Sequence, residues 1–147
     1  EMGIKGAACI AIAIFGVLQR RNDGKKSDEI KQAILELGAE LHYNLNININ
    51  QVKNRFDETC QGTVPVALWI IGQSHSFEDA IRRAVSLGAD ADTLGAIVGS
   101  IAEAIWDIPE WMKKKAMSYL PEEMGKVVRD FFKEVKMRRE EHLDIVT

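Results

Sequence analysis

Residues 88–95 read Gly88-Ala89-Asp90-Ala91-Asp92-Thr93-Leu94-Gly95 and lie between two segments whose apolar residues have helical spacing. Two carboxylates and a hydroxyl fall within four residues of this acidic loop. Such hard oxygen ligands suit Mg²⁺, Mn²⁺ or Ca²⁺ better than zinc or copper. The same acids also fit a simpler role, in which they cap a helix and interact with its dipole. The stretch alone leaves both interpretations open.

Two familiar acidic motifs are excluded by the register of the loop. An EF-hand loop starting at Asp90 would place Leu94 and Ile101 at positions where oxygen ligands are required. A phosphatase-type Asp-x-Asp-x-Thr motif follows a strand and needs its threonine one residue later than Thr93. The remaining arrangement puts Asp90 and Asp92 on one side of an extended stretch, with Thr93 at a helix start. This is half of a site for an octahedral ion.

The rest of the chain predicts helices throughout. The segment 44–54 alternates asparagine with leucine and isoleucine, but asparagine is a poor strand former and no partner strand is evident, so we expect an irregular connection there. The helix over residues 5–20 should be buried on most sides because its apolar arc is wide. Three further helices are expected after caps at Ser27, Thr63 and Ser76, and another over about 93–106. A short helix is expected between Pro109 and Pro121, and a long one after Pro121. The sequence therefore predicts one all-α domain over residues 1–147.

Composition narrows the class of protein. The 147 residues are 46% hydrophobic and 28% charged, with a net charge of −3, which is ordinary for a soluble globular domain and argues against a nucleic-acid footprint. No uninterrupted apolar run reaches the roughly 18 residues of a membrane span, and no signal-peptide layout is present. Cys9 and Cys60 fit a reducing compartment, so we expect a cytoplasmic location. Because Glu1 precedes Met2 and an apolar segment follows at once, we expect a fragment or a processed product.

Several motifs occur together in an order that resembles a known family. The acidic loop and the small-residue helix through Gly99 look like the second metal motif of the ADP-ribosylglycohydrolases. The segment 3–7 resembles that family's His-Pro-x-Gly-Ile-x-Gly-Ala motif, and the segments 55–56, 60–65 and 77–80 stand in the family's order and spacing. The resemblance runs from about Gly3 to Leu120. It implies an all-α orthogonal bundle with two Mg²⁺ or Mn²⁺ ions, hydrolysing the bond between ADP-ribose and a protein side chain or small acceptor.

Carried onto this chain, the resemblance assigns roles to individual residues. It implies that Asp90, Asp92 and Thr93 ligate metal, with Asp92 bridging the two ions and both acids serving catalysis. It also implies that a turn containing Cys60, Gln61, Gly62 and Thr63 borders the ADP-ribose pocket, and that Gly3 lies near the phosphates. Two plainer alternatives stay open: Cys60 is a packed thiol, or Gly3 only eases helix packing.

The chain also departs from the family pattern. The family has an early Thr-Asp-Asp cluster and a Gly-Asp segment, which are not found here, and Ala89 replaces a commoner glycine. The chain therefore resembles the C-terminal half of such an enzyme, and the isolated chain should be inactive. The alternative is a non-catalytic structural or binding module derived from the family. In either case we expect an apolar surface, covered by the missing N-terminal half or by self-association.

Overall fold

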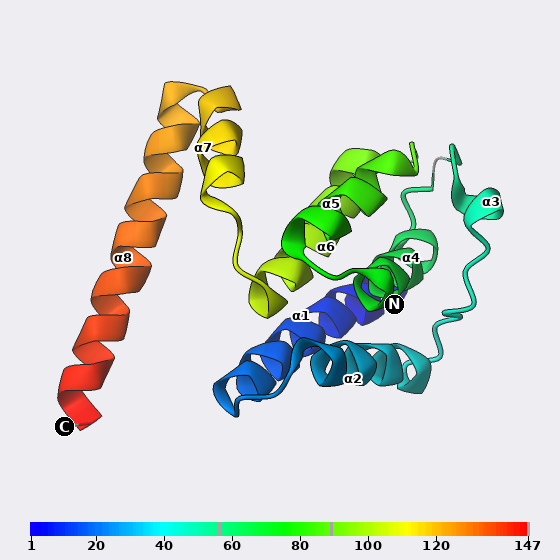
Figure 1. The fold of residues 1–147 in the computed structure, drawn as a ribbon, viewed down its shortest axis with the longest axis horizontal. Coiled ribbons are helices and arrows are strands. Elements are labelled where there is room, and N and C mark those ends of the chain that lie inside the picture. The colour runs from blue at the N-terminus through cyan, green and yellow to red at the C-terminus, as the bar shows by residue number, and fades with distance from the viewer. Residues whose placement is uncertain (56, 89, 147) are drawn as a thin grey trace. The chain divides into compact units, whose positions relative to one another are not determined.

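The computed structural model describes residues 1–55, 57–88 and 90–146, with side chains up to residue 137. These residues form α-helices joined by short connections, and no strand is found among them (Figure 1). The predicted all-α fold is confirmed. The helices are α1 (Met2–Asn22), α2 (Ser27–Glu40), α3 (Ile49–Val52), α4 (Cys60–Gln73), α5 (Phe77–Ser86), α6 (Ala91–Ile105), α7 (Glu110–Tyr119) and α8 (Glu122–Val146).

The chain divides into two compact units, Glu1–Ile108 and Pro109–Thr147. The first unit contains α1 to α6 and the acidic loop. The second contains α7 and α8, which follow Pro109 and Pro121 as expected. In the second unit the described part of α8 leaves Met124, Val127, Phe131 and Phe132 exposed. The expectation of one domain over residues 1–147 stays a prediction.

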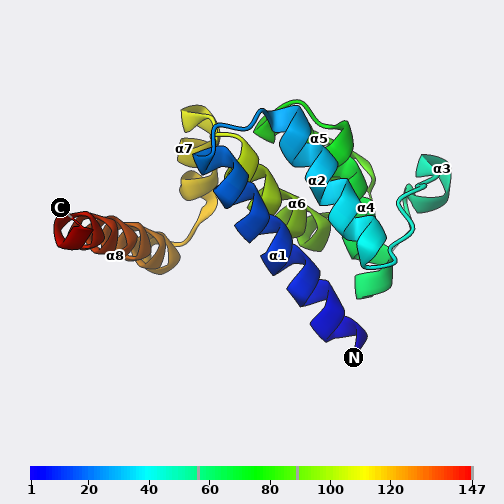
Figure 2. The same cartoon turned by 90° about the horizontal axis from the view of Figure 1, so that it is seen from below.

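The core of the first unit is organised around α4 and α6. Helix α4 contacts α1, α2, α5 and α6, and α6 contacts α1, α4 and α5 (Figure 2). The side chains of Leu68, Ile70 and Ile71 on α4 and of Val98 and Ile101 on α6 are completely buried. Asp90 directly precedes α6, and Asp92 and Thr93 lie in its first turn, so the packing of α6 in this core fixes where these residues of the acidic loop lie.

The starts of three helices differ from those predicted. Helix α4 begins at Cys60 and is capped by Thr59, whose hydroxyl accepts a hydrogen bond from the N–H of Gly62 at 3.1 Å. The cap expected at Thr63 is therefore wrong, because the helix starts one turn earlier. Ser27 is the first helical residue of α2 and not its cap. Helix α6 begins at Ala91, two residues before the predicted start.

The predictions for helix α5 and for the segment 44–54 were closer to the structure. Ser76 caps α5, with its hydroxyl accepting from the N–H of Asp79 at 3.1 Å, and Gly88 takes the left-handed conformation after the helix, with φ +61°. In the segment 44–54, the short helix α3 interrupts the irregular connection. This helix has no buried residue.

Helix α1 is not buried on most sides, contrary to prediction. It packs against α2, α4 and α6 through the stripe Gly6, Cys9, Ala13 and Val17. Its other side exposes the large residues that we call the α1 apolar face: Met2, Ile4, Ile12, Phe15 and Leu18. Helix α1, with a mean hydropathy of 1.8, is the one helix in the described part of the chain that is long and apolar enough to cross a membrane. Core helices of soluble proteins meet the same criteria.

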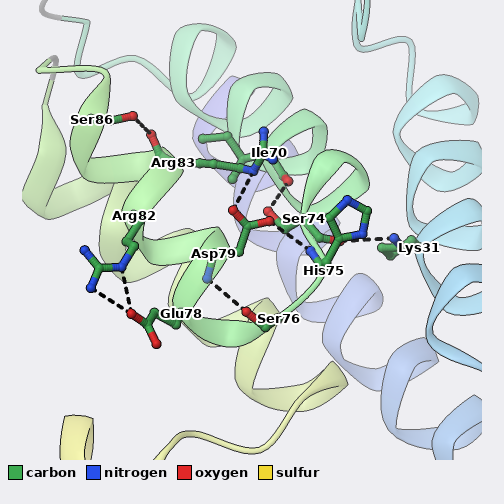
Figure 3. A network of polar contacts seen from close by, with 10 residues as sticks. All are labelled: Lys31, Ile70, Ser74, His75, Ser76, Glu78, Asp79, Arg82, Arg83 and Ser86. Atoms are coloured by element: carbon green, nitrogen blue, oxygen red, sulfur yellow. Dashed lines mark hydrogen bonds and ion pairs between the residues drawn. The ribbon is translucent and has the colours of Figure 1, made fainter.

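A polar network fixes the turn between α4 and α5 (Figure 3). The Nζ atom of Lys31 on α2 donates to the carbonyl of Ser74 at 3.1 Å and lies 2.9 Å from the carboxylate of Asp28. Ser74 is completely buried, and its hydroxyl donates to the carbonyl of Ile70 at 2.7 Å. Lys31 thus satisfies a buried carbonyl at the end of α4 and joins α2 to it.

Candidate metal centre and ligand pocket

Helices α1 and α4 begin close to one another, and α1 and α6 end close to one another. Near the start of α1, a Cβ atom on Gly6 would lie 3.0 Å from Cys60 Sγ and 3.5 Å from Val64, both at the start of α4. At the far end of α1, Arg21 donates to the carbonyl of Ala104 near the end of α6. The N-terminus of each helix carries a partial positive charge, and the acidic loop supplies negative charge at the N-terminus of α6.

The acidic loop enters α6 in a way that does not fit an ordinary cap. Asp90 occupies the N-cap position, yet its side chain makes no capping hydrogen bond. It is buried, with 7% of its surface exposed, whereas Asp92 and Thr93 in the first turn are exposed. A carboxylate is rarely buried without a partner. Asp90 therefore needs another reason to be there. Ala89 lies outside the described residues.

The other acid of the loop interacts with Asp90. The pKa of Asp92 lies below its ordinary value, and the first cause is the Asp90 carboxyl group, which donates a hydrogen bond to Asp92 when it is protonated. The backbone N–H groups of Asp92 and Thr93 act in the same direction. The fold thus brings the two carboxyl groups together at a helix N-terminus, where negative charge is stabilised.

The ligands at this point suit a hard cation but do not complete its shell. Asp90, Asp92 and Thr93 offer two carboxylates and a hydroxyl, which fit Mg²⁺ or Mn²⁺, and an octahedral ion takes about six ligands. Among the described residues, no group of three or more His, Cys, Asp and Glu side chains gathers closely enough to hold a metal. Asp90, Asp92 and Thr93 lie next to one another at the start of α6, and their role as metal ligands stays a prediction.

The residues predicted to border a ligand differ in their exposure and in the contacts they make. Gly3 is exposed, and a Cβ atom there would meet nothing within 4 Å, so it does not ease helix packing; Gly6 does so instead. Cys60 is half-buried against Gly6, which favours the packed-thiol alternative. The hydroxyl of Thr63 donates to the carbonyl of Thr59 at 2.9 Å inside α4. Gln61 remains exposed.

Gln61 and Gly62 line a pocket of about 490 Å³ between the start of α1, the connection around α3, and the start of α4. Three basic side chains border it: Lys5, His42 and Arg55. The Nζ atom of Lys5 also lies 4.4 Å above the centre of the Tyr43 ring, which is another lining residue. This volume and composition suit a small anionic ligand. Sequence reasoning missed His42 and Tyr43, because they belong to no local motif, and Lys5, because it stands at a variable position of the motif in the segment 3–7.

Asp57 is the one acid among the described residues that line this pocket. Its carboxylate accepts hydrogen bonds from the N–H and the hydroxyl of Thr59, at 2.9 and 2.7 Å. These bonds hold the pKa of Asp57 below its ordinary value. A Cβ atom on Gly62 would collide with this carboxylate, which explains the glycine at that position. The Asp57-x-Thr59 pattern was the available sequence signal. Phe56, between the pocket residues Arg55 and Asp57, lies outside the described residues.

Comparison with known proteins adds an independent result. The family model described as ADP-ribosylglycohydrolase matches residues 1–141. The ADP-ribosylarginine hydrolase Tri1 of Pseudomonas putida (strain GB-1) is 40% identical over 60 residues, which are 38% of this chain and 16% of that protein. Tri1 of Serratia proteamaculans (strain 568) is 39% identical over 56 residues, 35% of this chain and 15% of that protein. The alignments thus span about a sixth of the length of these relatives. No solved structure matches the chain.

Proposed function

Because the chain belongs to the ADP-ribosylglycohydrolase family, we propose that it supplies half of the metal site of an ADP-ribosyl-acceptor hydrolase. The observation that carries this proposal is Asp90. It is buried at the start of α6, makes no capping bond, and meets the carboxyl group of Asp92. A structural cap would be bonded to the helix backbone, whereas a metal ligand would face its fellow ligand.

In this proposal Asp90, Asp92 and Thr93 would hold Mg²⁺ or Mn²⁺. When bound, such ions would supply Lewis-acid chemistry for hydrolysis of the glycosidic bond. The chain's own contribution is to hold both carboxylates at the N-terminus of a helix that is fixed in the core. The two acids then need no reorganisation when a cation arrives.

The pocket beside Gln61 and Gly62 is proposed to bind the ADP-ribose part of the substrate. Lys5, His42 and Arg55 supply donors for a diphosphate, and the exposed Gly3 leaves room near the start of α1. In this proposal Cys60 and Thr63 do not contact the ligand. They support the turn from inside α4. The acceptor is an ADP-ribosylated protein or a small molecule.

The remaining ligands must come from another polypeptide segment. The α1 apolar face is exposed, with Ile4 77% and Phe15 63% accessible, and Gly95, at the start of α6, has open space where a side chain would lie. A large apolar surface on a soluble domain marks an interaction site. We propose that the N-terminal half of an ADP-ribosylglycohydrolase domain covers this face and completes the metal shell.

A Mn²⁺ titration followed by calorimetry tests the half-site. With three ligands from protein, the isolated chain should bind the metal weakly and release no ADP-ribose. The reason is that Mg²⁺ gives up its bound waters reluctantly, and three ligands replace few of them. Asp92→Asn should abolish the remaining binding, and Asp23→Asn, at an exposed acid after α1, should leave it unchanged. Sub-micromolar binding of two ions, or turnover by the isolated chain, would contradict the proposal.

The exposed α1 apolar face also favours a second candidate function, that of a non-catalytic helical module that self-associates. In that case wild-type protein should form a dimer or larger species, and Phe15→Ser should return it to a monomer. Light scattering after size-exclusion chromatography separates the candidates. A monomer that binds Mn²⁺ only through Asp90 and Asp92 supports the half-site, and a dimer indifferent to Asp92→Asn supports the module.

A further inference from the structure

The connection after α3 is joined directly to the acidic loop. Asn54, which follows α3, donates its backbone N–H to the carbonyl of Leu87 at 2.7 Å. Leu87 is buried at the end of α5, one residue before Gly88 and three before Asp90. This short hydrogen bond links two segments that are more than thirty residues apart in the sequence.

The conformations of both partners make the link specific. Asn54 has φ +59° and Gly88 has φ +61°, so two left-handed residues face each other. A Cβ atom on Gly88 would collide with Oδ1 of Asn54. The left-handed region is rare for residues other than glycine, and asparagine is among those that tolerate it best. A residue that can hold this conformation is therefore required at position 54 to present its N–H to Leu87.

We propose that Asn54 is a positioning residue for the metal site: its left-handed backbone pins the turn at Gly88 and so sets where Asp90 and Asp92 lie. The predicted change in metal affinity rests on the proposed function. The effect of Asn54 on the position of the loop can be tested independently of it. Asp90 lies two residues after Gly88, is buried, and directly precedes the first turn of α6, which carries Asp92. An error of about 1 Å in such a position can be costly at a reacting site.

Gly24 provides a matched control within the same unit. It also lies in the left-handed region, with φ +73°, but its N–H donates to the carbonyl of Arg21 at 3.0 Å, just after α1, and an added Cβ atom would meet nothing within 4 Å. Alanine at Gly24 therefore introduces left-handed strain away from the acidic loop and from the pocket. A comparison of alanine at positions 24 and 54 separates general left-handed strain from positioning of the loop.

The experiment measures two properties of the complete chain: amide hydrogen exchange of Asp92 and Thr93, and Mn²⁺ affinity by electron paramagnetic resonance. Asn54→Ala should accelerate the exchange and weaken Mn²⁺ binding by up to roughly five- to thirtyfold, the factor that corresponds to the cost of left-handed conformation in a residue other than glycine. Asn54→Gly keeps both the left-handed conformation and the N–H, so it should retain wild-type behaviour in both measurements. Gly88→Ala should reproduce the defect from the other side of the contact.

Gly24→Ala should change neither measurement. Wild-type exchange and affinity in Asn54→Ala would overturn the inference, as would a defect in Asn54→Gly equal to that in Asn54→Ala. If the wild-type chain binds no Mn²⁺ at all, the proposed function fails, and the exchange rates still decide whether Asn54 positions the loop.

Discussion

Replacing Asp90 by alanine distinguishes a metal ligand from a helix cap by a change in stability alone. Asp90 stands at the N-cap position of α6 without a capping hydrogen bond. If it were a structural cap, its loss should lower the free energy of unfolding. If it is held for a cation, its loss should leave the metal-free protein as stable as before or more stable. Ser76, which does cap α5, is the matched comparison.

The expected magnitudes follow from the contacts. Removing a capping side chain costs about 0.5–2 kcal/mol, so Ser76→Ala should lower the free energy of unfolding by about 1 kcal/mol. Asp90→Ala forfeits only an interaction with the helix dipole, worth about 0.3–1 kcal/mol. It also relieves repulsion between two acids, which is about 1 kcal/mol for unit charges 4 Å apart in water and larger near a protein surface. We therefore expect Asp90→Ala to change stability by about 0 to +1 kcal/mol.

The assay is urea denaturation monitored by circular dichroism, without metal and with excess Mn²⁺. A ligand that binds only the folded state stabilises it, so Mn²⁺ should raise the midpoint of the wild-type protein and of Ser76→Ala, but not of Asp90→Ala. A loss in Asp90→Ala as large as that in Ser76→Ala, with no difference in the response to Mn²⁺, would refute the metal interpretation.

Two further predictions concern the supports of the site. Lys31→Met should lower the free energy of unfolding by about 1.5–3 kcal/mol, because a charged donor is lost and the buried carbonyl of Ser74 is left unpaired. Lys25→Met, which removes an exposed ion pair with Glu29, should cost under about 0.5 kcal/mol in the same denaturation assay, and equal losses would contradict the argument. The hydrogen bonds from Thr59 lower the pKa of Asp57, so its contribution to stability is present above the ordinary value of 3.8 and is lost as the pH falls below it. The stability difference between wild type and Asp57→Asn should accordingly shrink between pH 6 and pH 3, and a constant difference would show that the charge is irrelevant.

The acidic loop could be predicted from sequence because its parts are adjacent in the chain. Asp90, Asp92 and Thr93 lie within four residues, and a helix start places such neighbours together with little help from the rest of the fold. The cap at Ser76 and the left-handed Gly88 are local in the same sense, and both were predicted correctly. The pocket is different in kind. Lys5 and Arg55 come from distant segments, and only the packing of α1 on α4 brings them to one cavity.

Helix α1 shows why a hydrophobic pattern did not reveal which side is buried. The buried stripe consists largely of small residues, including Gly6 and Ala13, while Ile12 and Phe15 are exposed. Small residues are buried where two helix backbones approach closely, as at the contact of Gly6 with Cys60. Periodicity that weights large apolar residues therefore assigns the core to the wrong face of such a helix.

The N-termini of α1, α4 and α6 differ in the acidic groups that neutralise them. Asp57 accepts hydrogen bonds at the start of α4, and Asp90 and Asp92 lie at the start of α6. Helix α1 has no acid in its first turn, and its Gly3 is open. In the proposed function the carboxylates at α6 attract the cation, while the uncompensated end of α1, with Lys5 beside it, favours the anionic part of the ligand. In that proposal the fold would separate the metal from the phosphates, since each group would be drawn to a different helix end.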